Sequence, residues 1–194
     1  MRDTCRIVTF RPIALALLVA APPMLGAQSS DSASSVYDSA ACPSCAEWNA
    51  PQQPVRIHGD TWYVGTHGLG AILVTSPQGH VLIDGGLPES APLVMANIRA
   101  AGFRVEDVRL ILNSHAHYDH AGGIAALQRA SGAEVAAHPW SAATMRLGSS
   151  LPEDPQHAIA LAYPAVRSVR DLEDVRRALG YEREGYLTSQ AAYG

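Results

Sequence analysis

Four side chains of the kinds that bind metal ions stand close together in LILNSHAHYDHAGG. His115, His117, Asp119 and His120 fall within six residues. In an extended segment, residues two apart point to the same side, so the first two imidazoles can face one ion. A third nitrogen from elsewhere in the chain would complete the three protein ligands of a catalytic zinc and leave the fourth coordination position for water. The aspartate and the last histidine supply an oxygen and a nitrogen with which a second metal site can begin.

The residues around this cluster favour a built site over a His-rich metal-buffering tract. VRLILNS (residues 108–114) leads in as a continuous apolar run of strand length, and Gly122 and Gly123 follow the last histidine. The cluster thus lies at the carboxyl end of a predicted buried strand, where α/β folds usually place their sites. A buffering tract would lack this frame of strand, turn and helix.

Strands and helices alternate along the rest of the predicted fold, which indicates the α/β class. We expect strands, of which the second and third form a hairpin around the turn PQGH, at Thr61–Thr66, Ala71–Ser76, Val81–Gly86, Val108–Ser114 and Ala133–His138. We expect helices at Ser90–Gly102, with Ser90 as N-cap, and at Gly122–Gly132. The length of 194 residues suits one domain. A net charge of −4 without a Lys/Arg-rich block argues against nucleic acid as a partner.

The N-terminus has the pattern of a secretory signal peptide. Three arginines precede the apolar segment PIALALLVAAPPML, and small residues follow, so we expect cleavage after Ala27. A membrane anchor is the alternative, but the apolar run is shorter than the roughly 20 residues that a span needs. We therefore expect a signal peptide at residues 1–27, a flexible lead-in at 28–47, and a periplasmic protein without membrane attachment after cleavage.

Cys42 and Cys45 form the motif CPSC in the predicted mature chain. In an oxidising compartment they can pair as a local disulfide or remain as two free thiols. A zinc knuckle or a redox motif is a further alternative. No second cysteine pair and no surrounding βαβ pattern support either of these.

The stretch NSHAHYDHAGG resembles the metallo-β-lactamase superfamily, whose signature is HxHxDH, and is most similar to its B3 subclass. RIHGDTWYVGT, ILVTSPQGHVLIDGG and YPAV extend the resemblance over roughly residues 48–170. It implies an αββα sandwich with zinc held at the edge where the two sheets end. Trp48 would then lie near the mouth of the site.

The resemblance also implies the roles of single residues. His115 and His117 would bind the first zinc, and Asp119 and His120 the second. Asp84, in LIDGG, would support the metal loop by hydrogen bonds without binding zinc itself; a simple turn aspartate is the alternative.

The reaction implied is hydrolysis of β-lactam antibiotics, including carbapenems, by attack of a metal-bound hydroxide on the ring amide. Asp119 would hold the second metal and orient the hydroxide, and the enzyme would confer antibiotic resistance. Another superfamily hydrolase, a thioesterase or a lactonase, is the alternative. The sequence does not predict the oligomeric state.

The sequence departs from the family pattern after Arg170. Each zinc should receive a third histidine from later in the chain, and neither expected motif is found; residues 171–194 look like an unrelated tail with a short amphipathic helix. We therefore expect an incomplete domain at residues 48–170, only the N-terminal half to two-thirds of the sandwich. Its activity would depend on substitute ligands, for which the candidates are His58, His67, His80, His138 and His157. An inactive fragment is the alternative.

Overall fold

The computed structural model describes residues 41–166 and 168–172. The predicted signal peptide, the first part of the lead-in and nearly all of the predicted tail lie outside the described residues. Within the described residues, no helix has both the length and the apolar character needed to cross a membrane.

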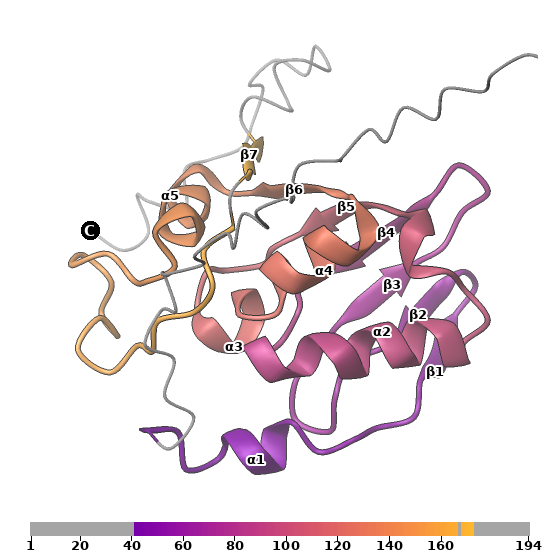
Figure 1. The fold of residues 1–194 in the computed structure, drawn as a ribbon, viewed down its shortest axis with the longest axis horizontal. Coiled ribbons are helices and arrows are strands. Elements are labelled where there is room, and N and C mark those ends of the chain that lie inside the picture. Colours follow the sequence, from indigo (N-terminus) through magenta and orange to yellow (C-terminus); the bar gives the residue numbers. More distant parts are fainter. Residues whose placement is uncertain (1–40, 167, 173–194) are drawn as a thin grey trace, which may run out of the picture. The chain divides into compact units, whose positions relative to one another are not determined.

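Short strands and helices make up the described part of the chain (Figure 1). The strands are β1 (Val55–His58), β2 (Thr61–Tyr63), β3 (Ile72–Val74), β4 (His80–Ile83), β5 (Val108–Leu112), β6 (Glu134–Ala137) and β7 (Arg170–Asp171). The α-helices are α1 (Cys45–Trp48), α2 (Ala91–Ala100), α3 (Tyr118–Ala121), α4 (Ile124–Ser131) and α5 (Pro139–Leu147), and two 3-10 helices are η2 (Pro88–Ser90) and η3 (Val105–Asp107).

All seven strands form one sheet, in which they follow one another in sequence order. Neighbours from β1 to β4 are antiparallel, and neighbours from β4 to β7 are parallel. The predicted hairpin is the β3–β4 pair, and the predicted buried strand is β5, which lies between β4 and β6. Because β4, β5 and β6 are parallel, their carboxyl ends meet at one edge of the sheet.

Helices cover one face of this sheet. Parallel neighbours need a crossover connection, and α2 connects β4 to β5 while α3 and α4 connect β5 to β6. Figure 1 shows α2 and α4 running across the same face of the sheet. This arrangement confirms the predicted α/β class. The described residues form one helix layer on one sheet, which is half of the expected αββα sandwich.

A row of apolar residues in register crosses the sheet beneath the helices. Each is at most 1% exposed, and the row consists of Leu73, Leu82, Ile111 and Val135. The helices contribute Val94, Ile98, Ile124 and Leu127, which are equally buried. Full burial of one such side chain contributes about 1.5–3 kcal/mol to folding. This core holds β4 and β5 rigidly where their ends carry the site.

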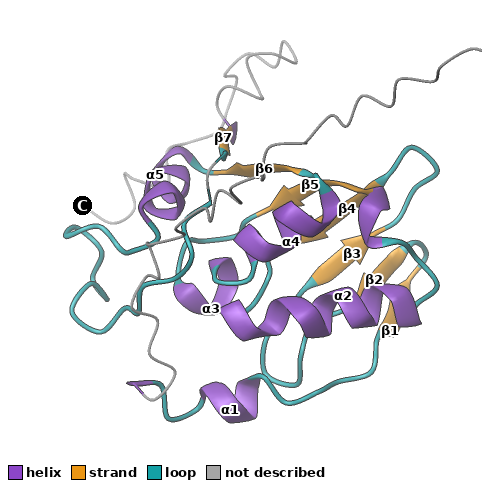
Figure 2. Cartoon of the chain, in the orientation of Figure 1, coloured by secondary structure: helices purple, strands orange, loops and turns teal. Residues whose placement is uncertain are grey.

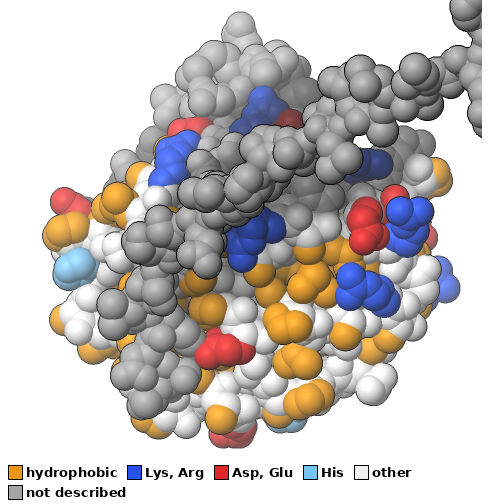
Figure 3. Space-filling model, in the orientation of Figure 1, with side chains coloured by type: hydrophobic (Ala, Val, Ile, Leu, Met, Phe, Trp, Pro, Cys, Tyr) orange, Lys and Arg blue, Asp and Glu red, His pale blue; other side chains and the backbone are white. Residues whose placement is uncertain are grey.

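The opposite face of the sheet is apolar as well but less covered. Ile72, Ile83 and Leu112 lie in register on it and are partly exposed. On the edge strand β1, Val55 and Ile57 are 51% and 55% exposed. The outer side of the helix layer also carries hydrophobic side chains among the polar ones (Figure 3).

Five strands and α-helices were not expected from the sequence: α1, β1, α3, α5 and β7. The predicted flexible lead-in ends inside α1, which starts at Cys45. Two local signals indicate α5, because Pro139 occupies its first turn and Gly148, with a φ of 72°, ends it. Ser90 stands at the N-cap of α2 as predicted, but its side chain does not cap the helix. It accepts a hydrogen bond from the Leu87 backbone N–H instead (3.0 Å).

Candidate metal centre

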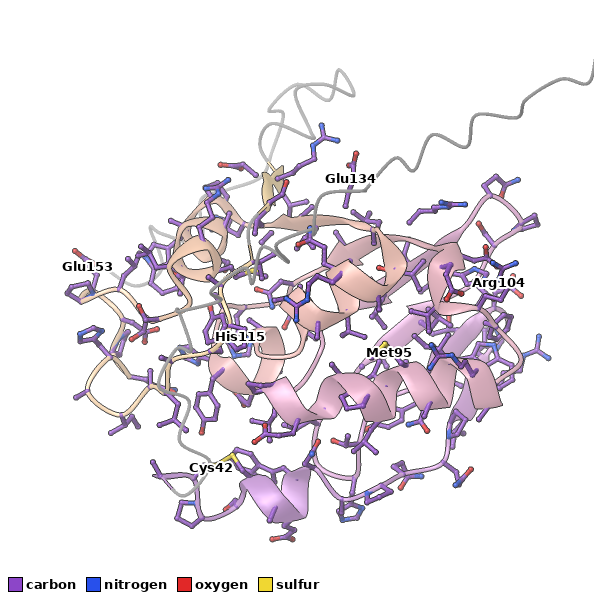
Figure 4. The ribbon with its side chains drawn as sticks, viewed as in Figure 1. Cys42, Met95, Arg104, His115, Glu134 and Glu153 are labelled. Atoms are coloured by element: carbon purple, nitrogen blue, oxygen red, sulfur yellow. A yellow bond between two sulfur atoms is a disulfide. The ribbon has the colours of Figure 1, made fainter. Side chains whose placement is uncertain are left out.

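The cluster lies on the turn between β5 and α3. Ligand atoms of His115, Asp119 and His120 all lie within 4.8 Å of one another. β5 ends at Leu112, and α3 starts directly after His117, so a short extended stretch and one helical turn carry the whole cluster. The imidazole of His115 is central, with its ring centroid 4.9 Å from that of His117 and 3.9 Å from that of His120. Figure 4 shows His115 at this turn.

Asp84 holds this turn from the end of the neighbouring strand β4. Its side chain is buried, and Oδ1 accepts hydrogen bonds from the Ser114 backbone N–H (2.8 Å) and from Asn113 Nδ2 (3.2 Å). Oδ2 accepts from Ser114 Oγ (2.6 Å) and lies 2.9 Å from His120 Nδ1. With a φ of 61°, Asp84 is in the left-handed region that Asp tolerates better than most residues. This conformation lets the chain leave β4 while the carboxylate stays under the metal turn.

Glycines allow the two turns to touch. The backbone N–H of Gly85 donates to the His120 carbonyl (2.9 Å), and that of Gly123 donates to the Gly86 carbonyl (3.0 Å). A Cβ on Gly85 would lie 2.9 Å from the Ile124 backbone nitrogen, closer than real Cβ atoms come. A side chain at either contact would therefore push the helix start away from the β4 turn. Of the two glycines singled out in the sequence, Gly123 allows this close approach, and Gly122 allows a similar one to Pro88.

The charges of the cluster are coupled. Burial opposes ionisation of Asp84, but hydrogen bonds from His120 and Ser114 outweigh it and lower its pKa. The hydrogen bond to Asp84 raises the pKa of His120 against the effect of burial. Burial and the two neighbouring imidazoles lower the pKa of His115. The turn thus pairs one carboxylate with one imidazole and disfavours the charged form of the central imidazole.

His120 is oriented for a ligand by this pairing. Because Nδ1 donates to the Asp84 carboxylate, Nε2 is the nitrogen with a free lone pair when the ring is neutral. Nε2 lies 3.6 Å from Asp119 Oδ2. Metal-binding histidines usually donate their other N–H to a carboxylate or a carbonyl in this way. Imidazole nitrogens and a carboxylate oxygen suit zinc and similar transition metals. The residues present therefore fit a metal ion.

His117, the fourth predicted ligand, is not part of the set formed by the other three, and it contacts a residue that the sequence motif does not indicate. Its Nε2 lies 2.8 Å from Oδ2 of Asp154, which is 5% exposed and belongs to the loop after α5. Burial opposes ionisation of Asp154, but hydrogen bonds from the Gln156 backbone N–H and from His117 outweigh it and lower its pKa. The motif HxHxDH gives no sign of this contact, because the two residues are 37 positions apart.

The five candidate substitute ligands do not join the cluster. Within the part of the chain that the structure describes, His115, Asp119 and His120 are the one set of three metal-binding side chains. Three of the candidates have structural contacts instead. Nδ1 of His138 accepts from the Trp140 backbone N–H and caps α5, and Nδ1 of His80 accepts from that of Ser76. Nδ1 of His157 lies 2.9 Å from Ser150 Oγ.

Cys42 and Cys45 form a disulfide. Both are buried in a small cluster with Leu69 and Leu87, and Tyr118 packs against them and donates a hydrogen bond from its hydroxyl to Cys42 Sγ (3.7 Å). Of the alternatives open from the sequence, the structure shows the structural pair. The segment around α1 thus contacts Tyr118, the first residue of α3, at the disulfide.

Trp48 belongs to the same small cluster. Its ring is partly buried against these residues, and its carbonyl accepts hydrogen bonds from Thr66 Oγ1 (2.7 Å) and the Gly68 backbone N–H (2.9 Å). The structure therefore gives Trp48 a packing role, and its predicted place near the mouth of the site stays a prediction.

Comparison with known proteins identifies the family to which the chain belongs. The model of the metallo-beta-lactamase superfamily matches residues 71–188. Among solved structures, Rm3 metallo-beta-lactamase is 60% identical with a TM-score of 0.66, and the match covers 67% of this chain and 48% of that one. MEM-A1, a subclass B3 metallo-beta-lactamase from a soil metagenome library, is 52% identical with a TM-score of 0.63, over 64% of this chain and 47% of that one.

A third neighbour, the metallo-beta-lactamase SMB-1 in complex with mercaptoacetic acid, is 48% identical, with a TM-score of 0.62 and coverage of 64% and 48%. The chain thus spans about half the length of these solved structures. The family model covers more than half of this chain, and it includes the turn with the ligand cluster. The chain therefore belongs to the metallo-β-lactamase superfamily, a family of metal-dependent enzymes.

Proposed function

We propose that this protein is a zinc-dependent β-lactamase of the B3 type, which hydrolyses β-lactam antibiotics, carbapenems among them. The observation that carries the proposal is the cluster of His115, Asp119 and His120, with ligand atoms within 4.8 Å of one another, in a chain 60% identical to Rm3 metallo-beta-lactamase. A thioesterase or a lactonase of the same superfamily is the alternative. The subclass B3 neighbour at 52% identity favours the β-lactamase.

The proposed ligand assignment uses the residues of the turn. His115 and His117 would bind the first zinc, and Asp119 and His120 the second. Bound zinc would polarise the amide carbonyl of the substrate and lower the pKa of water. In the reaction, water adds to that carbonyl and the ring C–N bond breaks, which leaves a carboxylate and an amine.

The side chains of the turn hold and orient the reactants. The Asp119 carboxylate would orient the attacking water by accepting a hydrogen bond, and it is the proposed catalytic residue. Asp84 acts through His120, since its hydrogen bond at Nδ1 fixes the ring. Both oxygens of the Asp84 carboxylate accept hydrogen bonds, from Ser114, Asn113 and His120, which supports its role as a positioning residue rather than a ligand.

The proposal requires a third histidine ligand for each zinc. The described residues bring no further histidine into the cluster. We therefore propose β-lactam hydrolysis from the type of metal site, and the activity has to be measured on this chain itself. The residues of the N-terminal segment further lead us to propose export to the periplasm. The complex of SMB-1 with mercaptoacetic acid supports a small molecule as the binding partner.

The test measures zinc bound per purified chain together with hydrolysis of a carbapenem and of a thioester. Carbapenem turnover that is lost in Asp119→Ala and unchanged in Asp60→Ala supports the proposal, since Asp60 is an exposed aspartate away from the site. Thioester cleavage without β-lactam cleavage would favour the alternative enzyme. Little zinc and no turnover would show an inactive fragment and refute the proposal.

A further inference from the structure

Asp154 is a buried carboxylate that faces the metal turn from a distant part of the chain. It lies on the loop between α5 and β7, drawn as loop in Figure 2. Its side chain is 2% exposed, and Oδ2 lies 2.8 Å from His117 Nε2. Neither the sequence motif nor the proposed catalytic step uses this residue. Buried carboxylates are rare unless they are paired, so the contact calls for a functional or structural reason.

The loop around Asp154 is built to hold this carboxylate in place. Oδ1 accepts a hydrogen bond from the Gln156 backbone N–H (2.8 Å), so the two oxygens are divided between the loop and the histidine. The backbone N–H of Asp154 donates to the Leu151 carbonyl (3.0 Å), and its carbonyl accepts from the His157 N–H (2.9 Å). The orientation of the carboxylate is therefore set before any ligand binds.

The same loop forms a second hydrogen bond to the metal turn, at the residue next to His117. The hydroxyl of Tyr163, which is 1% exposed, donates to the Ala116 carbonyl (2.7 Å). Ala116 is the residue directly before His117. Tyr163 is itself anchored, because its backbone N–H donates to the carbonyl of Gly148 at the end of α5 (2.8 Å). Two consecutive residues of the metal turn are thus fixed by one loop.

The contact determines which nitrogen of His117 can bind a ligand. An ionised carboxylate only accepts hydrogen bonds, so the Nε2 that faces Asp154 carries the hydrogen. In a neutral imidazole the other nitrogen, Nδ1, then has the free lone pair. His120 is oriented in the opposite way, because its Nδ1 donates to Asp84 and its Nε2, 3.6 Å from Asp119 Oδ2, remains to bind a ligand. Two buried carboxylates from two elements thus select opposite nitrogens of two histidines on the same turn.

We propose that Asp154 is a positioning residue of the metal centre, which fixes His117 in the Nε2–H form and leaves its Nδ1 as the nitrogen that can bind a metal. The proposal rests on the metal-binding part of the proposed function and not on β-lactam turnover. Carboxylates that accept from a metal-binding histidine typically affect metal affinity 10–100-fold. We therefore expect a loss of about 10–100-fold in zinc affinity when the Asp154 carboxylate is removed.

The first measurement is the protonation pattern of the imidazoles in the full, metal-free wild-type chain, by ¹⁵N NMR of the histidine side chains. We expect hydrogen on Nε2 of His117 and on Nδ1 of His120. Hydrogen on Nδ1 of His117 in the wild type would overturn the proposal. This measurement needs no variant, so it decides the point even if a substitution prevents folding.

The second measurement is zinc affinity, by competition with a chromophoric chelator, for Asp154→Ala, Asp154→Asn and the control Glu153→Ala. Glu153 is exposed on the same loop and carries the same charge, so the control corrects for a general electrostatic effect (Figure 4). We expect loss of the Nε2–H form and of affinity in Asp154→Ala, partial rescue in Asp154→Asn, whose amide oxygen still accepts a hydrogen bond, and wild-type behaviour in the control. Equal affinities for folded Asp154→Ala and Glu153→Ala would refute the proposal.

The two proposals fail in different ways. Wild-type chain that binds zinc with the expected imidazole pattern but does not cleave a carbapenem refutes the β-lactamase function and supports the role of Asp154. A carbapenemase whose zinc affinity does not respond to Asp154→Ala refutes the role of Asp154 alone.

Discussion

Gly123, at the N-terminus of α4, packs against Gly85, in the turn after β4, so closely that no side chain fits between them. A Cβ on Gly123 would overlap the carbonyl oxygen of Gly85, and one on Gly85 would lie 2.9 Å from the Ile124 nitrogen. The backbone of the metal turn depends on this contact, because Gly85 N–H donates to the His120 carbonyl in the same place (2.9 Å). The precision of the ligand cluster therefore comes from backbone packing as well as from side-chain hydrogen bonds.

We predict that Gly123→Ala destabilises the protein and weakens metal binding. The added methyl group must displace the start of α4 from the β4 turn, and overpacking of this kind costs about 1–3 kcal/mol. The free energy of unfolding in urea and the zinc affinity measure the two effects. Gly70→Ala is the control, because a Cβ there meets nothing within 4 Å. Equal stability of the two variants would contradict the packing argument.

The pair of Asp84 and His120 predicts a pH window for the stability of the metal-free protein. Since the folded pKa of Asp84 is lowered, its contribution is present above the unfolded value of about 3.9 and is lost as the pH falls through the folded pKa. Since the folded pKa of His120 is raised, its contribution is complete below about 6.5 and is lost as the pH rises through the folded pKa. The pair therefore stabilises most between these two values.

Asp84→Asn tests this window. We expect it to lower the free energy of unfolding by about 1.5–3 kcal/mol at pH 5.5, as for other hydrogen bonds to charged groups, and by less at pH 8.5. Urea unfolding of the metal-free chain at both pH values measures the difference. Asp60→Asn, at an exposed position, serves as the reference for the loss of one charge. A loss that is the same at both pH values would show that the His120 pairing contributes nothing.

The core beneath the site predicts a strong contrast between two isoleucines. Ile111 on β5 is fully buried, whereas Ile159 is 75% exposed. Ile111→Ala should lower the free energy of unfolding by about 2–5 kcal/mol, because it removes buried methylene groups and leaves a cavity. Ile159→Ala should change it by less than about 0.5 kcal/mol, as is usual for surface positions. Denaturant titration measures the free energy of unfolding of both variants. Because both carry an Ile-to-Ala substitution, they differ only in the burial of the position.

The disulfide predicts a modest stabilisation that reducing agents remove. Cys42 and Cys45 close a short loop, for which the chain-entropy estimate is about 2 kcal/mol. The double variant Cys42→Ser, Cys45→Ser should therefore lose about this amount in thermal or urea unfolding. Dithiothreitol should destabilise the wild type by a similar amount and leave the double variant unchanged. If dithiothreitol destabilises the double variant as much as the wild type, the Cys42–Cys45 disulfide is not the cause and the prediction is wrong.

The sequence by itself determined the local parts of this protein. The β3–β4 hairpin, the central strand β5 and the helices α2 and α4 were predictable, because each depends on the periodicity of neighbouring residues and on nearby turn residues. The grouping of His115, Asp119 and His120 was predictable for the same reason, since six residues on one tight turn cannot move far apart.

Only the tertiary structure decided the contacts between distant segments. Asp154 meets His117 across 37 positions and Tyr163 meets Ala116 across 47, and no local pattern specifies such pairs. The histidines outside the motif show the converse: His80 and His138 had the right chemistry for a ligand, yet they bond to nearby backbone N–H groups. Side-chain type and spacing can nominate a ligand, but where the packed strands and loops place that side chain decides whether it reaches the site.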